Sequence, residues 1–193
     1  FNVYRTLRSI NPSPYLFFFD YGYFKIFGSS PEAQLIVQSG KAEIHPIAGT
    51  FRRTGDDEKD AVAAGLLAKD PKENSEHVML VDLARNDLSR NGSQVVVEKN
   101  REIQFYSHVI HLVSKVSCTM KKATKTFRVV ADTFPAGTLS GAPKHRALQL
   151  IDQYETTKRN VYGGAIGYMD FHGNFNHAII IRSFLSKNHE LHY

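Results

Sequence analysis

Arg182 is the side chain in this sequence best suited to binding an anion. It lies in the run from Ala178 to Phe184, where strand alternation places it on the same side as Ile180. If that side is internal, the arginine needs an anion beside it, because an unpaired buried charge is very costly. A carboxylate of the protein is the commoner partner for a buried arginine, and a carboxylate of a ligand is the alternative.

Two glutamates could hold a metal ion. Glu73 and Glu76 are one helical turn apart, so their carboxylates share a face of the helix predicted there. Hard divalent cations such as Mg²⁺ take oxygen ligands of this kind. Taken alone, the pair is more typical of a solvated acidic helix end, where Asp and Glu are common.

Three more segments combine residue types that binding sites use. Residues 162–168 include three glycines, which indicates either the close approach of a ligand or a bulged strand packed on a helix. His111 is flanked by apolar residues, and a lone histidine in such a strand is more often a core residue than a catalyst. The segment from Thr138 to Lys144 leads into a helix whose first amides can bind an anion, but its glycine spacing excludes a Walker loop.

The elements that must position these residues follow from the hydrophobic pattern and the turn signals. Three hairpins are predicted, from residues 15–20 with 23–27, 34–37 with 42–47, and 161–171 with 175–186. Helices are predicted over residues 56–69, 71–89, 125–133 and 142–154, and further strands over 95–97 and 106–120. Paired hairpins imply an α+β fold with antiparallel sheets packed against helices, in a single domain over residues 1–193.

Composition narrows the class of protein. With 42% hydrophobic and 22% charged residues among 193, the chain is typical of one folded domain. The net charge of +5 fits an anionic small substrate as well as a nucleic acid, but the basic residues do not cluster in a recognition motif, so we expect no nucleic-acid binding. The densest basic stretch, residues 121–128, is interpreted as a solvated surface.

The single cysteine and the chain ends bear on location. Cys118 cannot form an internal disulfide, which indicates a reducing compartment and a buried structural thiol. No signal peptide or membrane-spanning apolar run is present, so a cytoplasmic protein without a membrane association is expected. The sequence begins with Phe1 and not with Met, and Tyr193 falls within a predicted strand, so both ends are expected to be cuts in a longer protein.

Six segments, in order along nearly the whole chain, resemble the chorismate-utilising enzymes, and most of all the large subunit (component I) of anthranilate synthases. Each motif alone is weak, and their common order and spacing make the resemblance specific. They are residues 11–15 (NPSPY), 28–32 (GSSPE), 46–50 (PIAGT), 76–88 (EHVMLVDLARNDL), 138–144 (TLSGAPK) and 162–165 (YGGA).

The resemblance implies an active site for chorismate, a dianion with two carboxylates, bound together with Mg²⁺. It makes Arg182 the group that grips a carboxylate of the substrate, as a bidentate fork. It makes Glu76 a Mg²⁺ ligand with Glu73 in support. The other residues implied at the substrate are His111 and Thr138 as active-site residues around its ring, together with Ala48, Thr50, Tyr162, Gly163 and Gly164.

The reaction implied is the addition of a nucleophile at C2 of chorismate with loss of the C4 hydroxyl. Hydroxide is a poor leaving group and needs a general acid, and Glu32 matches the family residue in that role. Such a carboxyl must keep its proton near neutral pH, which requires a raised pKa. In anthranilate synthases the nucleophile is ammonia from a glutamine amidotransferase subunit, and loss of pyruvate then gives anthranilate for tryptophan biosynthesis.

Ala48 bears on the choice among family members. Aminodeoxychorismate synthases usually carry a nucleophilic lysine at this position, and alanine cannot form that adduct. Isochorismate and salicylate synthases, phenazine-type enzymes that retain the pyruvyl group, and a non-catalytic chorismate-binding module stay open as alternatives. Pro14, Tyr15 and Leu16 resemble part of the pocket in which anthranilate synthases bind tryptophan as feedback inhibitor.

The resemblance also implies that the catalytic domain is truncated. The family continues beyond Tyr193 with a second set of acidic Mg²⁺ ligands. Losing carboxylate ligands should cost a hard-cation site considerable affinity, so this chain alone is expected to bind Mg²⁺ and chorismate poorly and to be nearly inactive.

Overall fold

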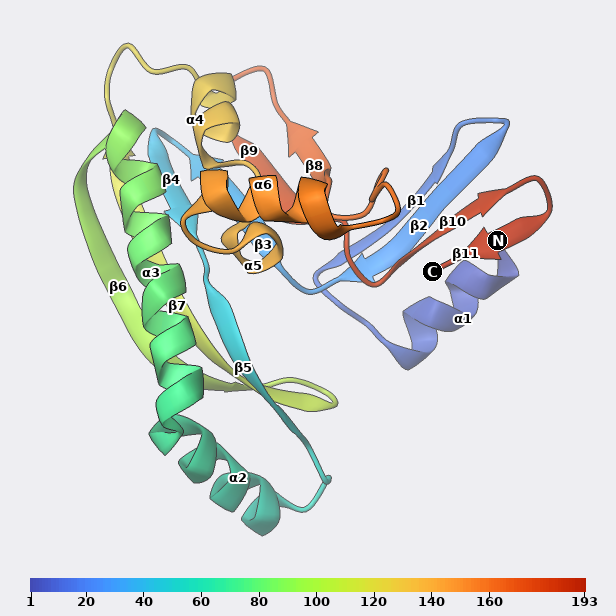
Figure 1. The fold of residues 1–193 in the computed structure, drawn as a ribbon, viewed down its shortest axis with the longest axis horizontal. Coiled ribbons are helices and arrows are strands. Elements are labelled where there is room, and N and C mark those ends of the chain that lie inside the picture. Colours follow the sequence, from blue (N-terminus) through green and yellow to red (C-terminus); the bar gives the residue numbers. More distant parts are fainter.

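The computed structural model describes all residues 1–193 and contains two antiparallel sheets (Figure 1). The smaller sheet has the strand order β1-β2-β10-β11, with β1 at Tyr15–Asp20, β2 at Phe24–Ser30, β10 at Ser183–Lys187 and β11 at Glu190–His192. The helix α1, Asn2–Ile10, lies against β2. Both chain ends therefore lie at the smaller sheet.

The larger sheet has seven strands in the order β5-β7-β4-β3-β9-β8, with β6 paired to β7. Its strands are β3 at Ala33–Gln38, β4 at Lys41–Ile44, β5 at Ile47–Arg52, β6 at Gly92–Phe105, β7 at Val109–Met120, β8 at Ala165–Met169 and β9 at Phe175–Ile179. All pairs are antiparallel, which confirms the predicted α+β class.

Helices cover one face of the larger sheet. They are α2 at Asp57–Lys69, α3 at Pro71–Asn91 and α4 at Thr126–Thr133, while the short helix α5 at Gly137–Ser140 contacts α3, and α6 at Lys144–Tyr154 contacts α5 (Figure 1). The long helix α3 begins where it does because the Asp70 side chain accepts hydrogen bonds from the amides of Lys72 and Glu73, and Pro71 fits the first helical position.

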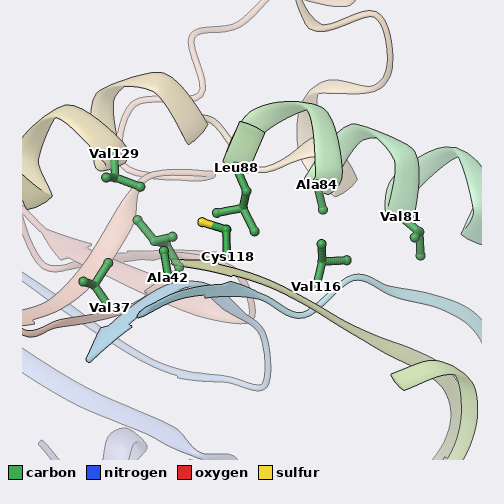
Figure 2. Close-up of a cluster of buried hydrophobic side chains, with 9 residues drawn as sticks. Val37, Ala42, Val81, Ala84, Leu88, Val116, Cys118 and Val129 are labelled. Atoms are coloured by element: carbon green, nitrogen blue, oxygen red, sulfur yellow. The ribbon is translucent and has the colours of Figure 1, made fainter. Parts of the chain in front are cut away.

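The main core lies between α3, α4 and the strands β3, β4 and β7 (Figure 2). Leu88 and Val116 are fully buried there, and Cys118 is a free, buried thiol among them. The interpretation of Cys118 as a structural residue is therefore confirmed. Burial of these aliphatic groups, at about 25 cal/mol per Å² of apolar surface, holds the helices on the sheet.

Several predicted boundaries were wrong. Strand β6 is 14 residues long, where only residues 95–97 were predicted, and α1 and the short helix α5 were not predicted. The second half of β6 is polar and mostly exposed, so it lacks a buried apolar stripe. The hairpin predicted over residues 161–171 and 175–186 exists as β8 and β9, but the chain leaves the sheet after Ile179.

No helix in the structure combines the length and the apolar character that crossing a bilayer requires.

Candidate active site

A cavity of about 210 Å³ brings together seven of the fourteen predicted site residues. It lies where the links between the two sheets meet β5, β7, α3 and α5. Its lining residues are Pro31, Glu32, Ile47, Ala48, Gly49, Thr50, Glu76, Tyr106, His111, Thr138 and Arg182. The cavity is thus polar and is built from segments far apart in the sequence.

Glu32 and Arg182 meet because both lie where the chain passes between the sheets. Glu32 follows β2 and precedes β3, while Arg182 lies between β9 and β10. The carbonyl of Glu32 accepts a hydrogen bond from the amide of Ile179 at 3.1 Å, and the amide of Ser29 donates to the carbonyl of Arg182 at 3.2 Å. The two links are therefore hydrogen-bonded to the chain beside them and hold both side chains at one place.

Arg182 differs from its prediction in two respects. It is not part of an alternating strand, because its φ is 51°, a left-handed conformation that ends the extended run. Its guanidinium is exposed and forms no ion pair with a carboxylate of the chain, so the commoner partner expected from sequence is absent. The arginine instead presents a free cation to the cavity, as an anionic ligand requires.

Glu32 has the properties of an acid. Thr138 Oγ1 donates a hydrogen bond to its Oε1 at 2.9 Å. Burial raises the pKa of Glu32 to about 7, although the bond from Thr138 and the charge of Arg182 both act to lower the pKa. The carboxyl therefore still holds its proton in part at neutral pH, which agrees with the raised pKa expected for a general acid.

His111 is a neutral acceptor. Its Nδ1 lies 2.8 Å from the carbonyl oxygen of Gly49, and since a carbonyl only accepts, Nδ1 carries the proton and Nε2 the lone pair. Burial lowers the pKa of His111, and the charge of Arg182 lowers the pKa further. Tyr106 packs edge-on against the ring at 5.4 Å. His111 is buried and also borders the cavity. It is therefore a hydrogen-bonded core residue and a cavity residue at the same time.

The two predicted metal-binding glutamates take different positions. Both lie on α3, and Glu76 lines the cavity. Glu73 does not line it, but its Oε2 is 3.3 Å from the point where a β-carbon on Gly49 would lie. The chain nowhere groups three or more acidic, histidine or cysteine side chains that could hold a metal ion. A cation with few protein ligands, completed by waters and by a substrate, is the kind this donor set fits.

The remaining predicted residues lie away from the cavity. Tyr162 is 48% exposed, and its ring centroid lies 6.0 Å from the guanidinium carbon of Arg159. Gly163 and Gly164 form a turn that exchanges hydrogen bonds with Ile180, at 2.9 and 2.8 Å. The turn before β8 therefore gives these glycines a structural reason that differs from the bulged strand considered from the sequence, and their contact with substrate remains a prediction.

The segment predicted to bind an inhibitor begins strand β1. Tyr15 and Leu16 pair with Ser30 and Ser29 of β2, and Pro14 is exposed just before them. The Tyr15 hydroxyl donates to Asn176 Oδ1 at 2.8 Å. These residues line none of the main cavities, so tryptophan binding at this segment remains a prediction.

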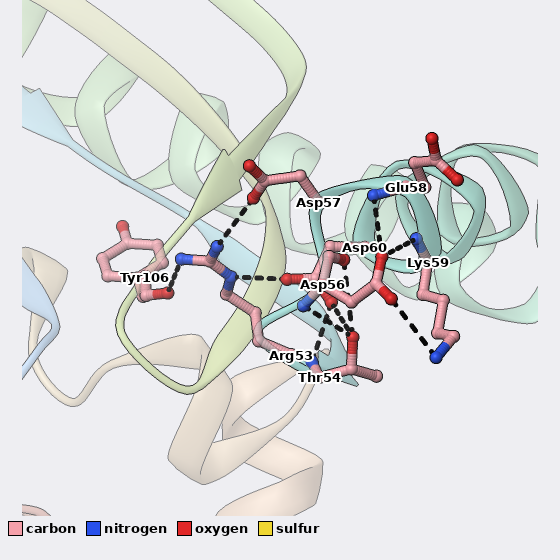
Figure 3. Close-up of polar contacts among 8 residues, drawn as sticks. All are labelled: Arg53, Thr54, Asp56, Asp57, Glu58, Lys59, Asp60 and Tyr106. Carbon is pink, nitrogen blue, oxygen red and sulfur yellow. Dashed lines mark hydrogen bonds and ion pairs between the residues drawn. The ribbon is translucent and has the colours of Figure 1, made fainter.

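Tyr106 is a cavity residue that the sequence did not point to. Its backbone carbonyl accepts a hydrogen bond from Arg53 Nη1 at 3.1 Å, and Arg53 Nε donates to the buried Asp60 at 2.9 Å (Figure 3). Hydrogen bonds from Thr54 and the ion pair with Arg53 lower the pKa of Asp60 to about 2. The network ties the turn that carries Tyr106 to the start of α2. A lone tyrosine at a turn belongs to no motif, which is why sequence reasoning missed it.

Comparison with known proteins assigns this antiparallel α+β chain to one class of enzymes. The family model for chorismate binding enzymes matches residues 1–193, and the chain belongs to that family. It is 47% identical over 190 residues to component 1 of anthranilate synthase from Acetivibrio thermocellus and 47% identical over 191 residues to that from Bacillus subtilis. The alignments cover 97% of this chain but only 38% and 37% of those proteins.

Solved structures agree with the fold. Anthranilate synthase component I from Streptococcus pneumoniae superimposes with a TM-score of 0.88 at 43% identity, over 97% of this chain and 42% of that one. The menaquinone-specific isochorismate synthase from Escherichia coli gives a TM-score of 0.79 at 22% identity, over 86% of this chain and 38% of that one. The second match shows a shared fold alone.

Proposed function

We propose that this chain forms the catalytic part of an anthranilate synthase large subunit, which converts chorismate and ammonia to anthranilate and pyruvate in tryptophan biosynthesis. The observation that carries the proposal is that one cavity contains both Glu32, whose pKa is raised to about 7, and Arg182, whose guanidinium forms no ion pair within the chain. A dianion that must lose a hydroxyl needs both groups. The identity to component 1 proteins supports this choice within the family.

In this proposal Arg182 binds a carboxylate of chorismate and orients the ring. Glu32 gives its proton to the C4 oxygen, so that water rather than hydroxide leaves as ammonia adds at C2. Thr138 holds the carboxyl of Glu32 in place. Loss of pyruvate then requires removal of the proton at C2, and the Nε2 lone pair of His111 is the neutral base in the cavity.

Mg²⁺ belongs to the proposal as a cofactor. Glu76 would hold it, with Glu73 next to Gly49 in support. When bound, Mg²⁺ supplies charge stabilisation at a substrate carboxylate. Few ligands from this chain suffice for Mg²⁺, because it usually keeps several waters and binds one or two carboxylates together with the substrate.

The partners follow from the same reaction. Ammonia is proposed to come from a glutamine amidotransferase subunit, and tryptophan to bind as inhibitor near Pro14, Tyr15 and Leu16. A cytoplasmic location and a reducing environment agree with the free thiol of Cys118. The chain spans about 38% of the length of the curated relatives it matches, so the activity is proposed for the enzyme that contains residues 1–193. The isolated chain is expected to be nearly inactive.

Isochorismate synthesis is the second candidate, because the fold is shared with such an enzyme. There water replaces ammonia as nucleophile, and the pyruvyl group stays on the ring. Ala48 lies in the cavity and offers no nucleophile, which disfavours aminodeoxychorismate synthesis but does not separate these two reactions.

The test is to incubate the enzyme that contains this chain with chorismate, Mg²⁺ and ammonium and to follow anthranilate fluorescence. We expect a rising signal that falls by about 10²-fold or more in Glu32→Gln, since general acids contribute that much. Glu190→Gln, at a side chain 74% exposed, is the control and should behave as the wild type. Formation of isochorismate without anthranilate would replace the first reaction by the second, and no loss of chorismate would reject both.

A further inference from the structure

A buried ion pair lies outside the cavity, at the end of the segment that carries Thr138. Lys144 Nζ is 2.6 Å from Asp87 Oδ2, and it also donates to the backbone carbonyl of Thr133 at 2.7 Å. The two charged side chains are only 16% and 5% exposed. A pair of this kind seldom adds net stability, because desolvation offsets the attraction, so its presence suggests a role in fixing geometry.

The geometry that Lys144 fixes is that of one loop. Thr133 is the last residue of α4 and Lys144 is the first residue of α6, so the ammonium group joins the two ends of the segment between them. The short helix α5, with Thr138 on it, lies inside that segment (Figure 1). Asp87 anchors the closed loop to α3, the same helix that presents Glu76.

A second, smaller cavity of about 40 Å³ makes the connection to the active site. It is lined by Glu32 and Thr138 on the side of the active site and by Asp87 and Thr133 on the side of the ion pair. Gln34 also lines it, and its Nε2 donates to the carbonyl of Thr133 at 3.3 Å. The carbonyl of Thr133 thus accepts from two side chains, and only this narrow space separates the pair from Glu32.

We propose that Lys144 is a positioning residue which, through Asp87 and Thr133, holds the Thr138 hydroxyl on the carboxyl of Glu32. The proposal rests on the proposed function, in which Glu32 is the acid. Lys144 does not touch the substrate cavity, so its effect on the reaction passes through the loop.

The charged, titratable and polar groups that face Glu32 determine how a movement of the loop changes the pKa of Glu32. They come from the linking segments, the sheet and the helices: Arg182, His111, Tyr106, Glu76 and Thr138 in the active-site cavity, and His45 and Asp87 across the smaller one. Among them, the bond from Thr138 and the charge of Arg182 lower the pKa of Glu32. When Thr138 moves away, the pKa of Glu32 rises, because burial then has less opposition.

The experiment compares Lys144→Met, Thr138→Val and their combination in the enzyme that contains this chain. Since Lys144→Met alone leaves Asp87 buried and unpaired, Asp87→Asn/Lys144→Met provides a second version without that charge. Arg85→Met breaks an exposed ion pair on α3 and is the matched control. The readouts are kcat, KM, the alkaline limb of the activity profile, and the titration of Glu32 by carbon-13 NMR of labelled glutamate.

We expect Lys144→Met to raise the pKa of Glu32 by about 0.5 to 1 pH unit. We also expect kcat to fall roughly 10- to 100-fold with a smaller change in KM. The double variant should resemble Thr138→Val alone, and Lys144→Arg should restore much of the activity. An unchanged titration of Glu32, or additive losses in the double variant, would overturn the inference. A wild-type enzyme without anthranilate activity would overturn the proposed function instead, while the Glu32 titration would still decide on Lys144.

Discussion

The raised pKa of Glu32 implies that the active-site acid destabilises the folded chain at neutral pH. In the unfolded chain the carboxyl has the ordinary value of 4.5, and in the folded chain the value is about 7. Below pH 4.5 both states bind the proton. As the pH rises through this window, the unfolded state loses its proton first, so the free energy of unfolding falls, and above pH 7 it falls no further for this group.

The magnitude follows from the two values. The interval from 4.5 to about 7 corresponds to about 3 kcal/mol at most. Because Glu32 keeps part of its surface exposed, we expect about half of that. Glu32→Gln keeps the shape and the acceptor for Thr138 but has no proton to lose. The variant should therefore match the wild type near pH 4 and exceed it in stability by about 1 to 2 kcal/mol at pH 8.

The assay is urea unfolding of both proteins at intervals from pH 4 to pH 8, with Glu190→Gln as the exposed control. The difference between Glu32→Gln and the wild type should grow between pH 4.5 and 7 and then level off. Two stability curves that run parallel over the whole range would refute the raised pKa of Glu32, and with it the physical basis for calling this carboxyl an acid.

His177 is 1% exposed and has no hydrogen-bond partner, and burial lowers its pKa to about 4. The free energy of unfolding should therefore fall by about 3 kcal/mol as the pH drops from 6.5 to 4. The variant His177→Phe should remove this pH dependence in urea unfolding. Asp60 is buried, ion-paired and hydrogen-bonded, with a pKa of about 2, so Asp60→Asn should lower the thermal midpoint at pH 7, and the deficit should close as the pH falls from 3.8 towards 2 (Figure 3). Gly167→Ala would place a β-carbon against the backbone oxygen of Asn176 and should strongly lower the melting temperature by circular dichroism, whereas Gly65→Ala, in open space on α2, should raise it slightly.

The fold was largely predictable where one face of a strand is buried and the other is not. The apolar, aromatic-rich run at residues 15–20 and the apolar residues of 33–44 mark strands, and the turns that follow them contain Gly22 and Gly40. The full length of strand β6 was not predicted, because its second half holds Lys99, Asn100 and Arg101 and its outer face is solvated. The backbone conformation of Arg182 was missed for another reason, since no local sequence signal predicts a left-handed residue between two apolar strands.

The identities of the site residues could be predicted from the sequence, but their convergence on one cavity could not. The resemblance supplied Glu32, His111, Thr138 and Arg182, and these four do meet in one cavity. No local pattern could show that they converge, because the contacts join links and strands that are distant in sequence. The hydrogen bond from Thr138 to Glu32 and the ion pair of Lys144 are products of that convergence, so only the structure reveals them.

The pairing of β9 between β3 and β8 has a consequence for synthesis on the ribosome. Strand β3 is made early, yet its second neighbour, Phe175–Ile179, emerges only near the end of the chain. Until then a nascent chain carries one apolar strand with an open edge, which is the form most prone to associate with other chains. The cavity likewise cannot close before Arg182 has left the ribosome, so no shorter translation product that ends before this residue carries a complete set of site residues.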